Sequence, residues 1–195
     1  MCKDRLERLA ADHRGMLLLQ DRPFLSWIAT KGELPYAEEY ILTVRLRTYA
    51  LTAQSGRYAV RAINGCTVKV TLWDSYPNVA PDIRMLSIPP IFHPDWYSKG
   101  VYCPGEPWSP DTALADHVLR MLGTVRYDPG LINDSRPANY KALSWYKKSQ
   151  GSGMLFPSDG TELTLNTPER AAELEKALLS PGEIIDSWEI SCPQT

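Results

Sequence analysis

The sequence lacks several features that would place it in a membrane, secreted or nucleic-acid-binding class. It contains no run of about eighteen apolar residues, which a transmembrane helix needs. The apolar stretch from Met16 to Leu19 is too short for a secretory signal, and charges of both signs precede it. The net charge is only -2, which argues against broad electrostatic capture of nucleic acid or anionic membrane. We therefore expect a cytoplasmic protein with neither kind of partner.

Cysteine is scarce, and its copies are far apart: Cys2, Cys66, Cys103 and Cys192. No two of them form a CxxC pair, so the sequence predicts no metal site of the zinc-ribbon kind and no dithiol redox site. The spacing does not resemble a disulfide framework either. We expect Cys66 to be structural. Cys103 has neighbours that indicate a reactive role.

The apolar pattern predicts an α+β fold. Spacings of three and four residues in the first segment, 6–17, predict an amphipathic N-terminal helix. Period-two alternation then predicts strands, with a fourth short strand to follow; the ranges are 40–48, 57–63, 67–72 and 83–86. Asn64-Gly65 predicts a hairpin turn, because both residue types tolerate positive φ. The short connections predict a four-stranded antiparallel meander with one covered face.

The second half of the chain is predicted to be an irregular segment followed by helices. Residues 87–110 are rich in proline, and their aromatic side chains are expected to anchor the segment by burial. One helix is predicted from Pro110, with Ser109 as its cap, and a second from Pro137. These elements would complete one domain over residues 1–150.

Residues 151–195 are predicted to form a C-terminal extension with one helix. Gln150-Gly151-Ser152-Gly153 has the composition of a short flexible linker, and a helix is predicted to begin at Thr167-Pro168. The extension would pack back on the domain or bind a partner. We expect it to be dispensable for the fold.

Three short strings stand in order along the chain. They are Tyr-Pro-Asn-Val-Ala-Pro at 76–81, His-Pro-Asp-Trp-Tyr-Ser-Lys-Gly-Val-Tyr-Cys at 93–103, and Trp-Ser-Pro at 108–110. Together they resemble the ubiquitin-conjugating enzyme family, where a His-Pro-Asn turn precedes the acceptor cysteine and a Trp-Ser-Pro follows it. Asp95 lies eight residues before Cys103, and Gly100 lies three before it, as that family requires. Residues 128–139 are similar to a further segment of the family, and the resemblance covers roughly residues 1–150.

The resemblance implies a UBC-like fold and a definite chemistry. The chain would carry a ubiquitin-like modifier as a thioester on Cys103, without a metal or organic cofactor. Its partners would be the modifier, an activating-type enzyme, and a target lysine or a ligase. Asp95 stands where the family has asparagine, and Pro104 stands where leucine is usual. These departures suggest a divergent branch, such as the stand-alone bacterial conjugating enzymes of antiviral ubiquitin-like operons.

The same resemblance assigns roles to individual residues. Support of the active-site loop falls to His93, Pro94, Gly100 and Trp108. His93 is expected to hold the turn by hydrogen bonds rather than to act as a general base.

Two acidic residues complete the predicted site. An ionised Asp95 only accepts hydrogen bonds, so we expect loop support first, contact with an incoming lysine second, and oxyanion stabilisation last. Asp134 would position the incoming amine, or cap the helix predicted from Pro137, or do both.

Three alternatives stay open. Cys103 is a buried, inert side chain, as most free cysteines are. The chain is a catalytically inactive UBC-fold module that binds a ubiquitin-like protein. The chain is an unrelated thiol hydrolase, which predicts that the side chains of Cys103 and His93 lie within hydrogen-bond reach.

Overall fold

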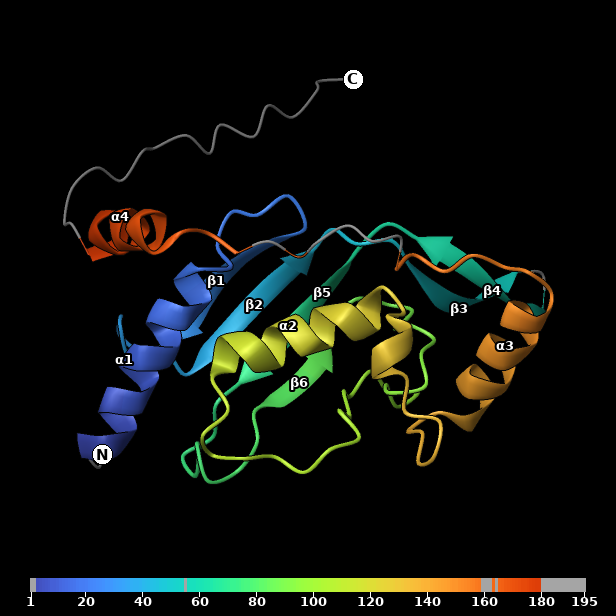
Figure 1. Cartoon of the computed structure of the whole chain (residues 1–195), viewed down its shortest axis with the longest axis horizontal. Helices are drawn as coiled ribbons and strands as arrows, with labels where there is room; N and C mark the ends of the chain where they lie inside the picture. Colours follow the sequence, from blue (N-terminus) through green and yellow to red (C-terminus); the bar gives the residue numbers. More distant parts are fainter. Residues whose placement is uncertain (1–2, 55, 159–162, 164, 180–195) are drawn as a thin grey trace, which may run out of the picture.

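The computed structural model describes residues 3–54, 56–158, 163 and 165–179 (Figure 1). Its helices are α1 (Lys3–Leu17), α2 (Leu114–Val125), the short 3-10 helix η1 (Pro129–Leu131), α3 (Tyr140–Gly151) and α4 (Pro168–Leu179). Its strands are β1 (Leu25–Lys31), β2 (Glu39–Val44), β3 (Thr48–Gln54), β4 (Arg57–Ile63), β5 (Cys66–Thr71) and β6 (Asp82–Met85). Within these residues no helix is long and apolar enough to cross a membrane.

The strands form a four-stranded antiparallel sheet and a separate two-stranded arm. The order in the sheet is β1-β2-β5-β6, and β3 pairs only with β4. The α+β class with an N-terminal helix and C-terminal helices is therefore confirmed. The prediction of a simple meander was wrong, because the β3–β4 arm is inserted in the chain between β2 and β5. Strand β1 was missed, since Ile28 is 63% exposed on the outer face and obscures the alternation.

Asn64-Gly65 is not a hairpin turn. The chain runs from β4 into β5 through these residues and changes its partner from β3 to β2. A Cβ atom on Gly65 would lie 2.6 Å from the carbonyl oxygen of Val44, so glycine permits this close approach of the two backbones. The Asn-Gly pair thus marks the junction of the arm with the sheet.

The main core lies between the sheet and two helices. Alternate side chains of β2 and β5, such as Leu42 and Val68, pack against the apolar stripe of α2, which includes Val118 and Leu122. Figure 1 shows α2 crossing one face of the sheet, with α1 at one end and α3 beside the β3–β4 arm at the other.

Helix α2 begins at Leu114, four residues later than predicted. Ser109 caps only a local turn, in which its hydroxyl accepts a hydrogen bond from the amide of Asp111. The amide of Leu114 instead donates to the buried carboxylate of Asp12 in α1 at 2.9 Å. A cap from a distant helix replaces the local one, which the sequence pattern cannot reveal.

Residues 87–110 contain no helix and no regular strand, as predicted. Isolated bridges tie the segment to its surroundings, such as Arg84 with Val101 and Trp96 with Tyr102. Trp96 is fully buried, and its indole N–H donates to the hydroxyl of Thr124 in α2 at 3.1 Å. Burial of the aromatic side chains therefore fixes an otherwise irregular segment.

Helix α3 begins at Tyr140 rather than Pro137 and packs against the arm. Asn139 is its N-cap, since the Asn139 side chain accepts from the amide of Ala142 at 3.1 Å. A second apolar cluster joins the two elements, with the ring of Tyr49 in β3 5.2 Å from that of Trp145. The predicted linker at 150–153 is instead the end of α3 and the turn that follows it.

The C-terminal extension packs back on α1. Helix α4 begins at Pro168 as predicted, and Ala171 is buried in the main core. The side chain of Asn166 donates to the carbonyl oxygens of Leu17 and Gln20, at 3.1 and 2.7 Å. These bonds satisfy carbonyl groups that the end of α1 leaves without helical partners. The predicted helix thus forms part of the domain surface.

Candidate active site around Cys103

Cys103 lies at the end of a short, tightly bonded stretch of backbone. Its amide donates to the carbonyl oxygen of Asp95 at 2.8 Å, and the amide of Tyr102 donates to that of Ile83 in β6 at 3.0 Å. The thiol of Cys103 is partly exposed, whereas Cys66 is buried, and burial raises the pKa of Cys66 to about 12. An accessible thiol on a fixed backbone is what a thioester carrier needs. A buried, inert cysteine therefore describes Cys66 and does not describe Cys103.

His93 is a structural residue in this site. Its imidazole is fully buried, and Nδ1 accepts a hydrogen bond from the amide of Asp95 at 3.0 Å. Nδ1 is therefore unprotonated, and Nε2 has no hydrogen-bond partner. Burial lowers the pKa of His93 to about 3. The ring packs edge-on against Tyr127, at 4.5 Å between centroids. His93 thus holds the turn and has no hydrogen bond to Cys103.

Asp95 links the cysteine segment to the loop before α3. Its Oδ1 accepts from the amide of Asn133 at 3.1 Å, while its Oδ2 is buried without a hydrogen-bond partner. Burial raises the pKa of Asp95 to about 6, against the opposing effects of the Asn133 amide and the nearby charge of Arg120. The carboxyl group is therefore an acceptor that holds the loop, and its ionised form is costly at neutral pH.

Pro94, Gly100 and Trp108 support the same loop. The carbonyl oxygen of Pro94 accepts from the amide of Asn139 at 3.0 Å, which ties the start of α3 to the turn. Gly100 has a φ of +79°, and an added Cβ would lie 3.0 Å from the Cβ of Met85. The indole of Trp108 donates to the carbonyl oxygen of Pro77 at 2.6 Å and joins the third string to the first.

Asp134 lies next to this arrangement on the exposed side. The preceding residue, Asn133, donates to Asp95 and packs its side chain against Gly105 in the loop after Cys103. The carboxylate of Asp134 is exposed and forms an ion pair with Lys147 in α3 at 3.4 Å. The helix-capping role falls to Asn139 and not to Asp134. An incoming amine would have to replace Lys147 as the partner of this exposed carboxylate.

Two residues near the thiol were missed. The phenol of Tyr97 lies close to the side chain of Cys103, and its interaction with that side chain raises the pKa of Tyr97. Tyr97 is 48% exposed, so its hydroxyl also meets solvent. Its place two residues after Asp95, in the same string as the cysteine, could have indicated it. The sequence pattern groups it with the aromatic residues of 87–110 that are expected to be buried, and its exposure contradicts that expectation.

Arg120 is the second missed residue. Its guanidinium bonds the carbonyl oxygen of Pro104 at 3.5 Å and pairs with Glu106 at 3.0 Å, so α2 holds the loop that follows Cys103. No local signal marks it, because it is one of several basic residues on a helix.

Other chemistries find little support in the part of the chain that the structure describes. There, no group of three or more histidine, cysteine or acidic side chains could hold a metal ion. In comparisons with known proteins, no family model and no curated protein matches the chain. The function is therefore argued from the three strings and from the geometry around Cys103.

Proposed function

We propose that the chain is a ubiquitin-conjugating-type enzyme that carries a ubiquitin-like modifier as a thioester on Cys103. The observation that carries the proposal is the partly exposed Cys103, whose amide donates a hydrogen bond to the carbonyl oxygen of Asp95 and whose side chain lies close to the phenol of Tyr97. This geometry supports a thiol that large partners can reach, since Cys103 is only partly buried.

The proposed reaction is two acyl transfers. In the first, the Cys103 thiolate attacks the thioester carbonyl of a modifier held on an activating-type enzyme, and the thiol of that enzyme leaves. In the second, a lysine amine or a ligase thiol attacks the new thioester, and Cys103 leaves as a thiolate. A transferring amine also loses a proton. No step requires a metal or an organic cofactor.

The neighbouring side chains take distinct roles in this scheme. Tyr97 donates a hydrogen bond to the thiolate and stabilises its charge. Asp95 is a positioning residue, because its carboxyl holds the 133–139 loop and its carbonyl holds Cys103. Asp134 meets the incoming lysine and orients its amine. A reduced thiol is needed throughout, which agrees with a cytoplasmic location.

The two rival functions fare differently. A thiol hydrolase requires a base on Cys103, but His93 bonds the Asp95 amide through Nδ1 and has no partner at Nε2. This arrangement disfavours that rival. An inactive UBC-fold binding module is disfavoured by the accessible thiol. It is the function to accept if wild-type protein binds the modifier without charging.

The deciding experiment is a charging reaction with cognate modifier, activating enzyme and ATP. We expect an adduct that reductant removes, absent in Cys103→Ala and retained in the matched control Cys66→Ala. An adduct that persists in Cys103→Ala would refute the proposal. Cys103→Ser should instead give an ester that resists thiols, which identifies the acylated position.

A further inference from the structure

Strand β4 has a free edge. On one side it pairs with β3 over seven consecutive residues, Arg57–Ile63, in unbroken register. On its other side, no strand and no isolated bridge meets it in the part of the chain that the structure describes. Other edges are met: Ile91 bridges to Ala50 in β3, and Val101 bridges to Arg84 in β6. The free edge of β4 therefore presents backbone N–H and C=O groups with which a further strand can pair.

This edge lacks most of the features by which proteins protect free edges, such as proline, bulges and very short strands. Strand β4 contains no proline, its register is unbroken, and its seven residues exceed the usual length of about five to six. Tyr58 is 76% exposed, and Ala62 is exposed as well. Only Arg57 and Arg61 bring charge to the strand. Pairing with another strand would cover the apolar side chains between them.

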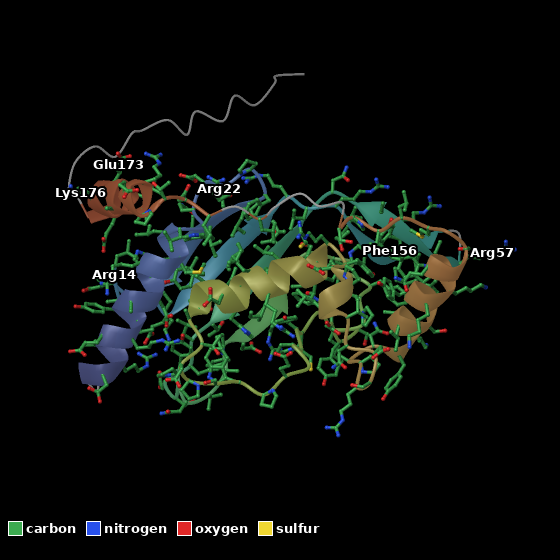
Figure 2. All side chains as sticks on the ribbon, in the orientation of Figure 1. Arg14, Arg22, Arg57, Phe156, Glu173 and Lys176 are labelled. Atoms are coloured by element: carbon green, nitrogen blue, oxygen red, sulfur yellow. The ribbon has the colours of Figure 1, made fainter. Side chains whose placement is uncertain are left out.

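The edge can be reached from outside the molecule. The β3–β4 arm lies at one extremity, far from α1 and α4 (Figure 1). Figure 2 shows Arg57 at this extremity. Every residue of β4 is exposed or partly exposed, whereas most residues of the central strand β5 are buried. A second chain can therefore approach β4 along its whole length.

The side chains of β4 are complementary to themselves in one antiparallel register. When two copies of a strand pair about a two-fold axis in one continuous sheet, residues directly opposite each other share a face. Centred on Val60, such a pair joins all seven residues of each copy. Tyr58 then faces Ala62 of the second copy, and Arg61 faces Ala59. Each arginine thus faces an apolar residue.

The two arginines exclude the neighbouring registers. Centred on Ala59, the pair would place Arg57 opposite Arg61 of the second copy, and centred on Arg61 it would place that residue opposite itself. Like charges directly opposite each other destabilise a strand pair. Each of these registers also joins only five residues, 57–61 or 59–63, instead of seven. The charges on β4 therefore select the register centred on Val60 rather than closing the edge.

We propose that the chain forms a two-fold dimer in which the β4 strands of two copies pair antiparallel about Val60. The pair joins both arms into one sheet of order β3-β4-β4-β3. The two β3 strands then lie about 14 Å apart, at about 4.8 Å for each step between strands. The α3 helix that packs on each β3 through Tyr49 and Trp145 therefore has more than the separation of about 8–10 Å that packed helices need. The proposal is independent of the proposed function, because it uses no residue of the site around Cys103.

The dimer is expected to be weak, because a strand pair of seven residues is only about 23 Å long and small interfaces bind weakly. Sedimentation velocity of the full chain between about 10 and 500 µM measures its Kd, which we expect to be on the order of 100 µM. A chain that remains monomeric over this whole range would overturn the proposal.

Ala59 tests the register by charge, because it faces Arg61 of the second copy at two places in the dimer. We expect Ala59→Glu to lower the Kd about fivefold and Ala59→Lys to raise it about fivefold. The matched controls Thr52→Glu and Thr52→Lys make the same changes on the same face, one strand further from the partner. At about 10 Å, their charges lie a screening length away and should shift the Kd less than about twofold.

Two outcomes of this series would overturn the proposal. Equal shifts at Thr52 and Ala59 would show an effect of net charge alone. Weakening by both Ala59→Glu and Ala59→Lys would mean that Ala59 faces itself, as in the register that the arginines exclude.

Cross-linking tests the register directly. Val60→Cys places two thiols opposite each other, at a Cα separation of about 4.5 to 5.5 Å that suits a disulfide. Ala62→Cys is the control, since the same register leaves its two copies about 13 Å apart along the strand. With every native cysteine except the buried Cys66 replaced by serine, we expect oxidised glutathione to cross-link Val60→Cys and not Ala62→Cys. Equal cross-linking of both variants, or none of Val60→Cys in protein that unfolds in urea as wild type does, would overturn the proposal.

Discussion

Asp95→Asn separates the two effects of the Asp95 carboxyl group, which are to hold the 133–139 loop and to bear a buried charge. Asparagine keeps an oxygen that can accept from the Asn133 amide, and it removes the ionisable oxygen that has no partner. In wild type, burial raises the pKa of Asp95 from 3.8 to about 6. The folded state therefore holds the proton more tightly than the unfolded state does between about pH 4 and pH 6.

The sign of the stability effect follows from this difference. The protonated carboxyl contributes stability below about pH 4, and that contribution is lost as the pH rises through about 6. At about 1.4 kcal/mol for each pH unit, a rise from 3.8 to about 6 corresponds to at most about 3 kcal/mol. Because the variant does not titrate, its unfolding free energy relative to wild type should increase by about 2 to 3 kcal/mol between pH 4 and pH 7.

Urea unfolding followed by tryptophan fluorescence measures this difference at each pH. Any constant cost of burying the amide cancels when the two pH values are compared. Asp95→Ala is the control, because it also removes the acceptor for Asn133 and should be less stable than Asp95→Asn throughout. A difference between Asp95→Asn and wild type that does not change with pH would refute the reasoning. A difference that changes with pH in the opposite direction would also refute it, and would mean that Arg120 stabilises the carboxylate.

Two further predictions concern Tyr97 and Asn166. Tyr97→Phe removes the hydroxyl close to Cys103, so charging should slow several-fold. The free energy of unfolding should change by less than about 0.5 kcal/mol, since the side chain is half exposed. Unchanged charging kinetics would contradict the role of Tyr97. Asn166→Ala removes the bonds to the end of α1 and should cost about 1 to 3 kcal/mol in urea unfolding. The exposed control Asn78→Ala should cost less than about 0.5 kcal/mol, and an equal effect of both variants would show that the extension contributes little.

The sequence predicts best those features that depend on residues close together in the chain. The α+β class, the irregular segment at 87–110 and the start of α4 follow from periodicity, proline content and capping residues. The strings around Cys103 also fix much of the site, because the turn at His93 and the bend at Gly100 lie in one continuous segment. Local spacing is enough to predict features of this kind.

Features that depend on distant contacts could not be predicted. The cap of α2 comes from Asp12 in another helix, and the Asn64-Gly65 pair serves a strand junction rather than a turn. The return of the extension to α1 rests on Asn166, whose partners lie almost 150 residues away in the chain. The burial of Asp95 is of the same kind, because acidic residues are exposed by default and its environment is built by α2 and the 133–139 loop.

The retained carboxylate at position 95 is itself an argument about function. An asparagine there would keep the bond to Asn133 and avoid the cost of a buried charge, so loop support alone does not explain an aspartate. Strained or costly groups persist where they contribute to the chemistry. What a carboxylate offers beyond an amide is a negative charge, and because both Asp95 oxygens are buried, that charge would act on a lysine near Cys103 through space and not by direct contact. Suppose that Asp95→Asn is more stable than wild type and slower only in transfer to amines. The buried charge that destabilises the fold is then also the group that assists transfer to lysine. If transfer to amines is also unchanged, the aspartate has no role that asparagine could not fill.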